Sequence, residues 1–175
     1  MKMHLLLVAM LATLVSCGKG STDAAKGDAA ATGGDLKMIE LVTTQDGSPL
    51  KIDPALFDTP AAKEFITTGK NPYIGVAAEI EAGKKKFNLY SCVACHGGHG
   101  EGAVGPGLQG PNFKYAKNAT NKGMFETIWH GTNGGMGAKG IGLMDPSDPK
   151  NGITPDELLK VIAWVRSMGK LTGNE

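Results

Sequence analysis

The stretch Cys92-Val93-Ala94-Cys95-His96 constrains this chain more than any other part of its sequence. The spacing Cys-x-x-Cys-His is typical of covalent haem c attachment, in which two thiols add to the vinyl groups of the porphyrin. A histidine directly after the second thiol is placed to ligate the iron. We therefore expect one covalently attached haem c, held by Cys92 and Cys95, with His96 as an iron ligand.

Other uses of the two cysteines explain the sequence less well. A thioredoxin-like redox pair would lie at a strand-to-helix turn of a βαβ unit, and no such pattern surrounds it. A zinc site could recruit His99 and His130, but this second pair of ligands lacks the spacing of known zinc modules. A plain disulfide would leave the adjacent His96 unexplained. Haem attachment is therefore the favoured interpretation.

The N-terminus predicts export. An apolar run over residues 5–15 follows Lys2 and is too short to span a bilayer, so residues 1–16 are interpreted as a signal peptide. The run ends in Leu-Val-Ser-Cys, which is similar to the lipobox of bacterial lipoproteins and predicts lipidation at Cys17. An ordinary signal peptide with Cys17 unmodified is the alternative. The expected location is the periplasm of a Gram-negative bacterium, with a lipid anchor as the only attachment to a membrane.

The segment after the signal differs in composition from the rest. Residues 18–35 contain no large apolar side chain, so residues 17–35 are predicted to form a flexible, lipid-anchored tether.

The mature chain carries no net charge. Residues 1–16 contain one base and no acid, which leaves 17 of the 18 basic residues against 17 acidic ones. Proteins that bind nucleic acids usually carry an excess of basic residues, so this neutral composition argues against a nucleic-acid partner.

Helix signals dominate the remaining chain. Residues 36–52 are predicted to form two short extended arms around a turn at Asp46-Gly47. Helix caps and apolar periodicity then predict helices that cover about residues 60–66, 76–90, 122–130 and 154–168. A helical glycine lowers helix stability, so we expect Gly83 to pack closely against the last helix.

A glycine-rich segment lies between the haem motif and the last helix, with 14 glycines among residues 97–142. A segment with so many glycines has too few side chains to build a core of its own. We therefore expect a haem to fill the interior. We expect the carbonyl of Pro106 to accept a hydrogen bond from His96, because iron-bound histidines commonly donate their second ring nitrogen in this way. The thioether of Met136, flanked by glycines, is the expected ligand on the opposite face of the iron.

Other sixth ligands remain open at this point: Met144, His99 and His130. If both faces of the iron are occupied, the protein transfers electrons and is not an enzyme. An open sixth position would instead indicate a haem peroxidase or sensor. The acidic turn at residues 145–152 lacks the spacing of a calcium loop, although a bound calcium ion remains an alternative.

With these residues placed, the chain resembles the class I cytochrome c family, and within it the cytochromes c-L. The general resemblance rests on the haem motif, the segment at 105–108, the glycine-flanked Met136 and the last helix. The more specific segments cover residues 58–61, 68–73, 118–128 and 159–166. The resemblance implies a mostly all-α class I cytochrome c fold, with three to five helices around the haem. It divides the chain into an N-terminal extension at 36–75 and a cytochrome c domain at 76–175.

The resemblance also implies a function. Cytochromes c-L accept single electrons from methanol dehydrogenases that contain pyrroloquinoline quinone (PQQ), and pass them to a downstream cytochrome c or oxidase. It does not choose between calcium- and lanthanide-dependent dehydrogenases. The alternative is a general lipoprotein cytochrome c that serves an oxidase. Lysines beside the haem edge would frame the docking surface in either case, and the candidates are Lys84, Lys85, Lys86, Lys114 and Lys139.

Overall fold

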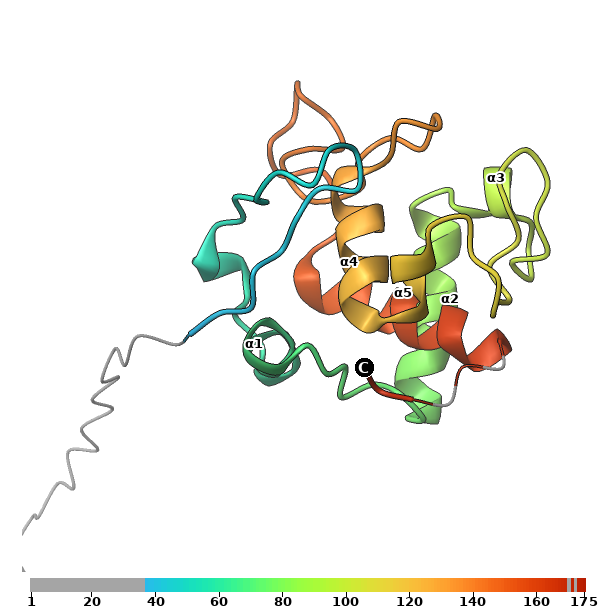
Figure 1. Cartoon of the computed structure of the whole chain (residues 1–175), viewed down its shortest axis with the longest axis horizontal. Helices are drawn as coiled ribbons and strands as arrows, with labels where there is room; N and C mark the ends of the chain where they lie inside the picture. The colour runs from blue at the N-terminus through green and yellow to red at the C-terminus, as the bar shows by residue number, and fades with distance from the viewer. Residues whose placement is uncertain (1–36, 170, 172) are drawn as a thin grey trace, which may run out of the picture. The chain divides into compact units, whose positions relative to one another are not determined.

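The computed structural model describes residues 37–169, 171 and 173–175 (Figure 1). The elements in chain order are η1 (Pro54–Leu56), α1 (Pro60–Thr68), α2 (Ala77–Leu89), α3 (Val93–His96), η2 (Ala116–Ala119), α4 (Asn121–His130) and α5 (Pro155–Met168). Within this part of the chain, the β-structure is limited to two isolated bridges, Val42 with Pro49 and Gly140 with Ile153. The predicted signal peptide, Cys17 and the tether lie outside the described residues. None of the helices described is long and apolar enough to cross a membrane.

Local capping signals set the helix ends as predicted. The hydroxyl of Thr59 accepts a hydrogen bond from the Ala62 amide at 3.1 Å, and α1 ends at Gly69, which has a φ of 76°. The hydroxyl of Thr120 caps α4. At the start of α5, Thr154 and Glu157 exchange hydrogen bonds in a capping box. The short elements η1, α3 and η2 were not predicted.

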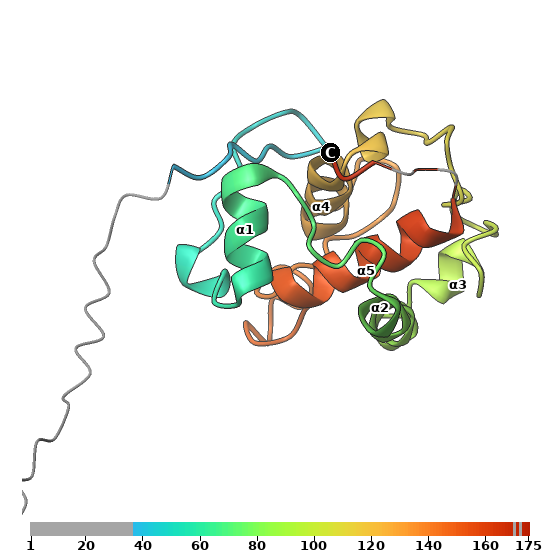
Figure 2. The same cartoon turned by 90° about the horizontal axis from the view of Figure 1, so that it is seen from below.

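Helices α2 and α5 cross in direct backbone contact, and Figure 2 shows α2 end-on where α5 passes it. A Cβ atom added to Gly83 would lie 1.9 Å from the carbonyl oxygen of Lys160. One turn further along, the rings of Phe87 and Trp164 lie 4.5 Å apart. The predicted close packing of Gly83 on the last helix is thus confirmed, and its neighbour is the α5 backbone.

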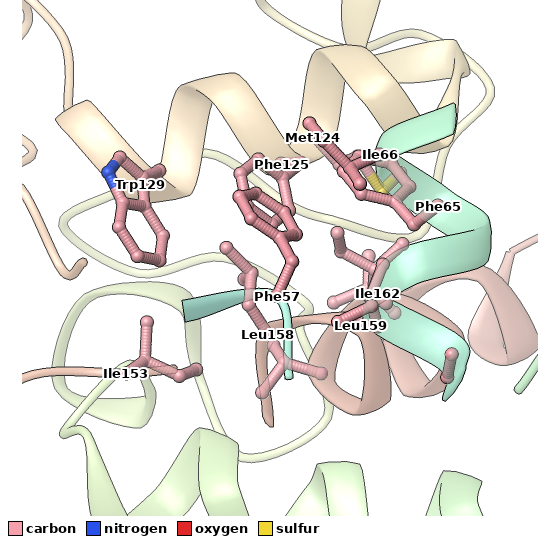
Figure 3. Close-up of a cluster of buried hydrophobic side chains, with 14 of the residues drawn as sticks. Phe57, Phe65, Ile66, Met124, Phe125, Trp129, Ile153, Leu158, Leu159 and Ile162 are labelled. Carbon is pink, nitrogen blue, oxygen red and sulfur yellow. The ribbon is translucent and has the colours of Figure 1, made fainter. Parts of the chain in front are cut away.

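The N-terminal segment and the helices share one apolar core. Phe57 and Phe65 pack beside Phe125 of α4, with ring centroids 6.2 and 4.7 Å away, and Phe125 stacks on Trp129 (Figure 3). Helix α5 forms the base of this cluster. Leu159 is fully buried together with Leu158 and Ile162, because α5 is covered by α1 as well as by α2 and α4.

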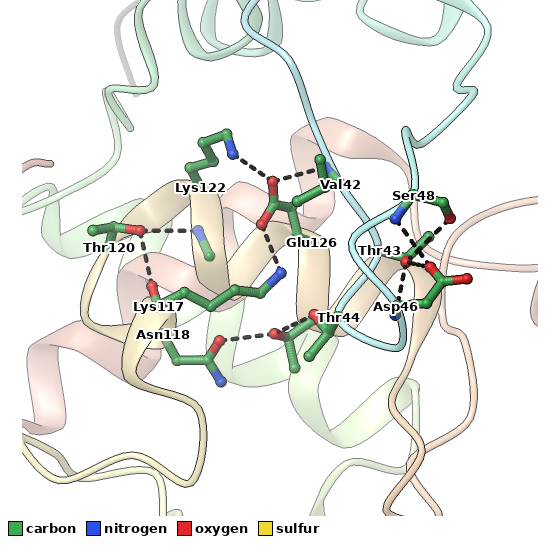
Figure 4. Close-up of polar contacts among 12 residues, drawn as sticks. Val42, Thr43, Thr44, Asp46, Ser48, Lys117, Asn118, Thr120, Lys122 and Glu126 are labelled. Carbon is green, nitrogen blue, oxygen red and sulfur yellow. Dashed lines mark hydrogen bonds and ion pairs between the residues drawn. The ribbon is translucent and has the colours of Figure 1, made fainter.

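A hairpin at residues 41–50 contacts α4 through a buried carboxylate. The arms pair at Val42 and Pro49 around the predicted Asp46-Gly47 turn. The Val42 amide donates to Glu126 Oε1 at 2.9 Å, and Lys117 and Lys122 bind the same carboxylate (Figure 4). Burial acts to raise the pKa of Glu126, but the hydrogen bonds from the two lysines outweigh it and hold this pKa below its usual value.

We expect Gly83→Ala to lower the free energy of unfolding by about 1–3 kcal/mol, although alanine favours helix. The added methyl group would overlap the Lys160 carbonyl and force the helices apart. Chemical denaturation of the haem-loaded protein measures the change. Glu81→Ala, at an exposed position of α2, is the control and should shift stability little. A Gly83→Ala protein as stable as the wild type would show that the crossing is not tight.

Replacing Glu126 with glutamine should destabilise the protein by about 1–3 kcal/mol near neutral pH, because the lysine contacts lose their charged partner. The folded-state pKa of Glu126 lies below the ordinary 4.5, so its contribution is present above pH 4.5 and is lost as pH falls below that value. Denaturation at a series of pH values should therefore show a shallower acid loss for Glu126→Gln than for the wild type. The exposed Glu64→Gln change is the control, and equal acid slopes for all three proteins would contradict the assignment.

Candidate haem site

The haem motif forms a single tight turn at the end of α2. Ser91 has a φ of 58° and redirects the chain, and α3 then begins after Cys92. The His96 amide donates to the Cys92 carbonyl at 3.0 Å, which closes the helical turn. Cys92 is partly buried and Cys95 is exposed, and the two are not joined in a disulfide. The turn brings both thiols and the imidazole to the wall of one cavity.

This cavity encloses about 1200 Å³ of empty space, including its open mouth. Its walls come from α2, α4, α5 and the glycine-rich segment, and they are mostly apolar. The apolar wall residues include Phe87, Val104, Leu108, Phe113, Met124, Ile128, Val161 and Val165. An apolar hollow of this size beside the motif suits a flat hydrophobic group, in agreement with the expectation that a haem fills the glycine-rich part.

One ring nitrogen of His96 forms a hydrogen bond with the protein backbone. The Nδ1 atom lies 2.8 Å from the carbonyl oxygen of Pro106, and the imidazole is 8 % exposed. Because a carbonyl only accepts, Nδ1 carries the proton and Nε2 keeps its lone pair for a metal. A Cβ added to the neighbouring Gly105 would lie 3.1 Å from the imidazole, closer than most Cβ contacts, so glycine lets the backbone pass close to the ring. The Pro106 contact has the geometry anticipated from the sequence.

Met136 lines the same cavity as His96, whereas Met144, His99 and His130 are not part of its wall. Its loop leaves α4 through Gly131, where a Cβ would lie 2.5 Å from the Met136 carbonyl oxygen. Beside the thioether, Cβ atoms at Gly135 and Gly137 would meet nothing within 4 Å, so the loop leaves room next to the methionine. A neutral imidazole and a thioether form a donor set that fits a haem iron.

The rival metal sites are not assembled in the described residues, which hold no group of three or more histidine, cysteine or acidic side chains able to share a metal ion. In the acidic turn, Asp145 accepts hydrogen bonds from the amide and hydroxyl of Ser147. Asp148 accepts from the Lys150 amide in the same way. These carboxylates are thus used to stabilise the local turn.

Sequence reasoning missed a polar corner of the cavity, to which Lys114, Tyr115, Asn118, Thr127 and Thr132 contribute. A Cβ at Gly134 would lie 3.0 Å from Lys114 Nζ and 3.5 Å from the Tyr115 hydroxyl. A porphyrin that carries two carboxylates needs such a corner, so the cavity matches haem in both its apolar and polar parts. The signal available in the sequence was Lys114-Tyr115, which lies directly before η2, but Lys114 was considered only as a docking residue.

Comparison with known proteins agrees with a haem cofactor. The cytochrome c family model matches residues 80–169, and members of that family carry covalently bound haem c. Cytochrome c-L of Methylorubrum extorquens is 42% identical over 112 residues, which are 63% of this chain and 51% of that protein. The chain thus spans about half the length of this curated relative.

Two crystal structures of cytochromes cL resemble the chain in fold. The protein from Methylophaga aminisulfidivorans MPT is 35% identical, with a TM-score of 0.64 over 75% of this chain and 82% of that one. The protein from Hyphomicrobium denitrificans is 39% identical, with a TM-score of 0.64 over 76% and 75% of the two chains. These likenesses confirm the predicted all-α cytochrome c fold.

Replacing Met136 with alanine should open the sixth position of the iron, so that the reduced, haem-loaded protein binds carbon monoxide rapidly. The wild type should bind it slowly because the thioether must first leave. Flash photolysis or stopped-flow spectroscopy measures the rates. Met144→Ala is the matched control and should behave as the wild type; rapid binding by Met144→Ala with slow binding by Met136→Ala would reverse the assignment.

Proposed function

We propose that this chain, which belongs to the cytochrome c family and has a covalently bound haem c as its cofactor, carries single electrons from a quinoprotein methanol or alcohol dehydrogenase to a downstream cytochrome or oxidase. The observation that carries the proposal is the placement of His96 and Met136 on the wall of one cavity. Two protein ligands leave no coordination position for a substrate. Electron transfer is the chemistry compatible with such an iron.

Each site residue has a defined part in this function. Cys92 and Cys95 would hold the haem through thioether bonds, and the Pro106 carbonyl fixes the orientation of the His96 ring. When bound, the haem supplies a one-electron iron couple. The thioether of Met136 and the apolar wall would both favour the reduced state, because burial disfavours the more highly charged ferric form.

The electron donor is inferred from the relatives. Three proteins named cytochrome c-L or cL match this chain at 35–42% identity. The resemblance to the cytochromes c-L implies a PQQ-dependent methanol dehydrogenase as the electron donor. We extend this partnership to the present chain. A periplasmic location follows from the same relationship and from the predicted signal peptide, with Cys17 as the proposed site of a lipid anchor.

The proposed transfer surface is the mouth of the cavity. Val104 and Cys95 both line the cavity and are exposed, Val104 to 90 %. Among the candidate docking lysines, Lys114 lines the cavity, whereas Lys86 forms an ion pair with Glu157 of α5. We therefore assign the docking role to Lys114 ahead of Lys86.

Purified PQQ-dependent methanol dehydrogenase should reduce the oxidised protein in stopped-flow mixing, at a rate that falls as salt is added. Lys114→Gln should slow the reaction about 2- to 10-fold at low ionic strength and less at high ionic strength. Lys63→Gln, at an exposed position on α1 outside the cavity wall, is the control.

The possible outcomes separate the candidate functions. No reduction by the dehydrogenase at any ionic strength, in a protein that ascorbate reduces readily, would contradict this partner and favour a general carrier. A salt-independent rate that Lys114→Gln leaves unchanged would instead contradict the docking surface alone.

A further inference from the structure

The loop that carries Met136 has little structure of its own. Residues 132–138, here called the Met136 loop, include glycines at 134, 135 and 137, and residues 133–135 are exposed. The loop is closed internally by a hydrogen bond from the Thr132 amide to the Met136 carbonyl, at 2.8 Å. The chain returns to α4 after it, where the Gly140 amide donates to the Trp129 carbonyl at 3.0 Å. The ends are therefore fixed, while none of residues 132–138 belongs to the apolar core.

Within the described residues, a single hydrogen bond connects this loop to another segment. The side-chain amide of Asn133 donates to the backbone carbonyl of Gln45 at 2.9 Å. Gln45 lies at the turn of the hairpin at residues 41–50, 88 positions earlier in the chain. The N-terminal extension therefore reaches the loop that carries the proposed iron ligand, although Gln45 does not line the haem cavity.

The hairpin is itself attached firmly to α4. The Val42 amide binds buried Glu126, and the hydroxyls of Thr44 and Thr127 lie 2.9 Å apart (Figure 4). The Thr127 hydroxyl donates in turn to Asn118 Oδ1 at 2.8 Å. Since Thr127 and Asn118 line the haem cavity, the hairpin is anchored to the cavity wall on one side and to the loop on the other.

The turn of the hairpin is also stiff. The Asp46 carboxylate accepts hydrogen bonds from the hydroxyl of Thr43 and the amide of Ser48. These contacts, with that of Thr43 the largest, lower the pKa of Asp46 to about 2, so the turn keeps its ionic form over the physiological pH range. A turn held in this way presents the Gln45 carbonyl in a fixed position.

We propose that the N-terminal hairpin positions the Met136 loop, and that the contact between Asn133 and Gln45 determines how firmly the thioether stays on the iron. This inference rests on the assignment of Met136 in the proposed function. Losing the contact frees a glycine-rich loop whose ordering is entropically costly, so the loop opens more often. The extension at 36–75 would then control ligand exchange at the iron without contacting the iron site itself.

The test uses imidazole, which displaces an axial thioether from ferric haem at a rate set by opening of the methionine loop. Asn133→Asp keeps the size of the side chain but removes the donor, and it should bind imidazole on the order of 5-fold faster than the wild type in the full-length, haem-loaded protein. Asn133→Ala should do the same. Thr44→Val, which removes the hydroxyl contact of the hairpin with Thr127 of α4, should act in the same direction. Asn88→Ala, at an exposed position of α2, is the matched control.

The ferric absorption spectrum separates the two ways in which the inference can fail. The wild type should show the charge-transfer band of a methionine–iron bond; its absence would overturn the Met136 assignment and with it the role of the hairpin. If the band is present but both Asn133 variants and Thr44→Val bind imidazole at the wild-type rate, the positioning role alone is wrong. A faster rate in the Asn133 variants, with Asn88→Ala unchanged, supports it.

Discussion

The backbone contact between Gly83 of α2 and Lys160 of α5 determines where a haem can be held. Only a residue without a Cβ permits this approach, and it brings Phe87 and Trp164 together one turn further along. Helix α2 then ends directly before the haem motif, so the crossing fixes the position of His96 relative to α5. The cavity forms on this side because α4 packs on α5 while the glycine-rich segment cannot fill the space.

Polar contacts define the second half of the site. The carbonyl of Pro106 selects the tautomer of His96, and the lysine and hydroxyl groups around Gly134 provide a corner suited to carboxylates. Buried Glu126 links α4 to the N-terminal hairpin through the Val42 amide. The extension is consequently part of the same core as the haem-bearing helices, and it contacts the loop that presents Met136.

Local signals in the sequence predicted most of the fold. The capping box at Thr154 and the glycine after α1 act within one turn, so they can be recognised without tertiary information. The hydrogen bond between His96 and the Pro106 carbonyl was also anticipated, because iron-bound histidines commonly donate in this way. The assignment of Met136 as an iron ligand stays a prediction that ligand chemistry favours. The preference for Met136 over Met144 gained support only when the structure showed which side chain lines the cavity.

What the sequence did not predict depends on contacts between distant segments. Lys114 and Thr132 meet around Gly134 only because the loops on both sides of α4 return to one end of the cavity. The hydrogen bond from Asn133 to Gln45 joins positions 88 residues apart, and no pattern in either segment indicates it. The full burial of Leu159 likewise depends on the packing of α1 against α5.

In the proposed function, His96 and Met136 occupy both faces of one haem iron and so confine the protein to electron transfer. Proton NMR of the reduced, haem-loaded protein tests this most directly, because the porphyrin ring current shifts an axial methionine methyl group far outside the usual protein range. We expect one such three-proton resonance, assigned to Met136 by selective labelling. A spectrum without it, or its assignment to Met144, would show that Met136 does not ligate the iron.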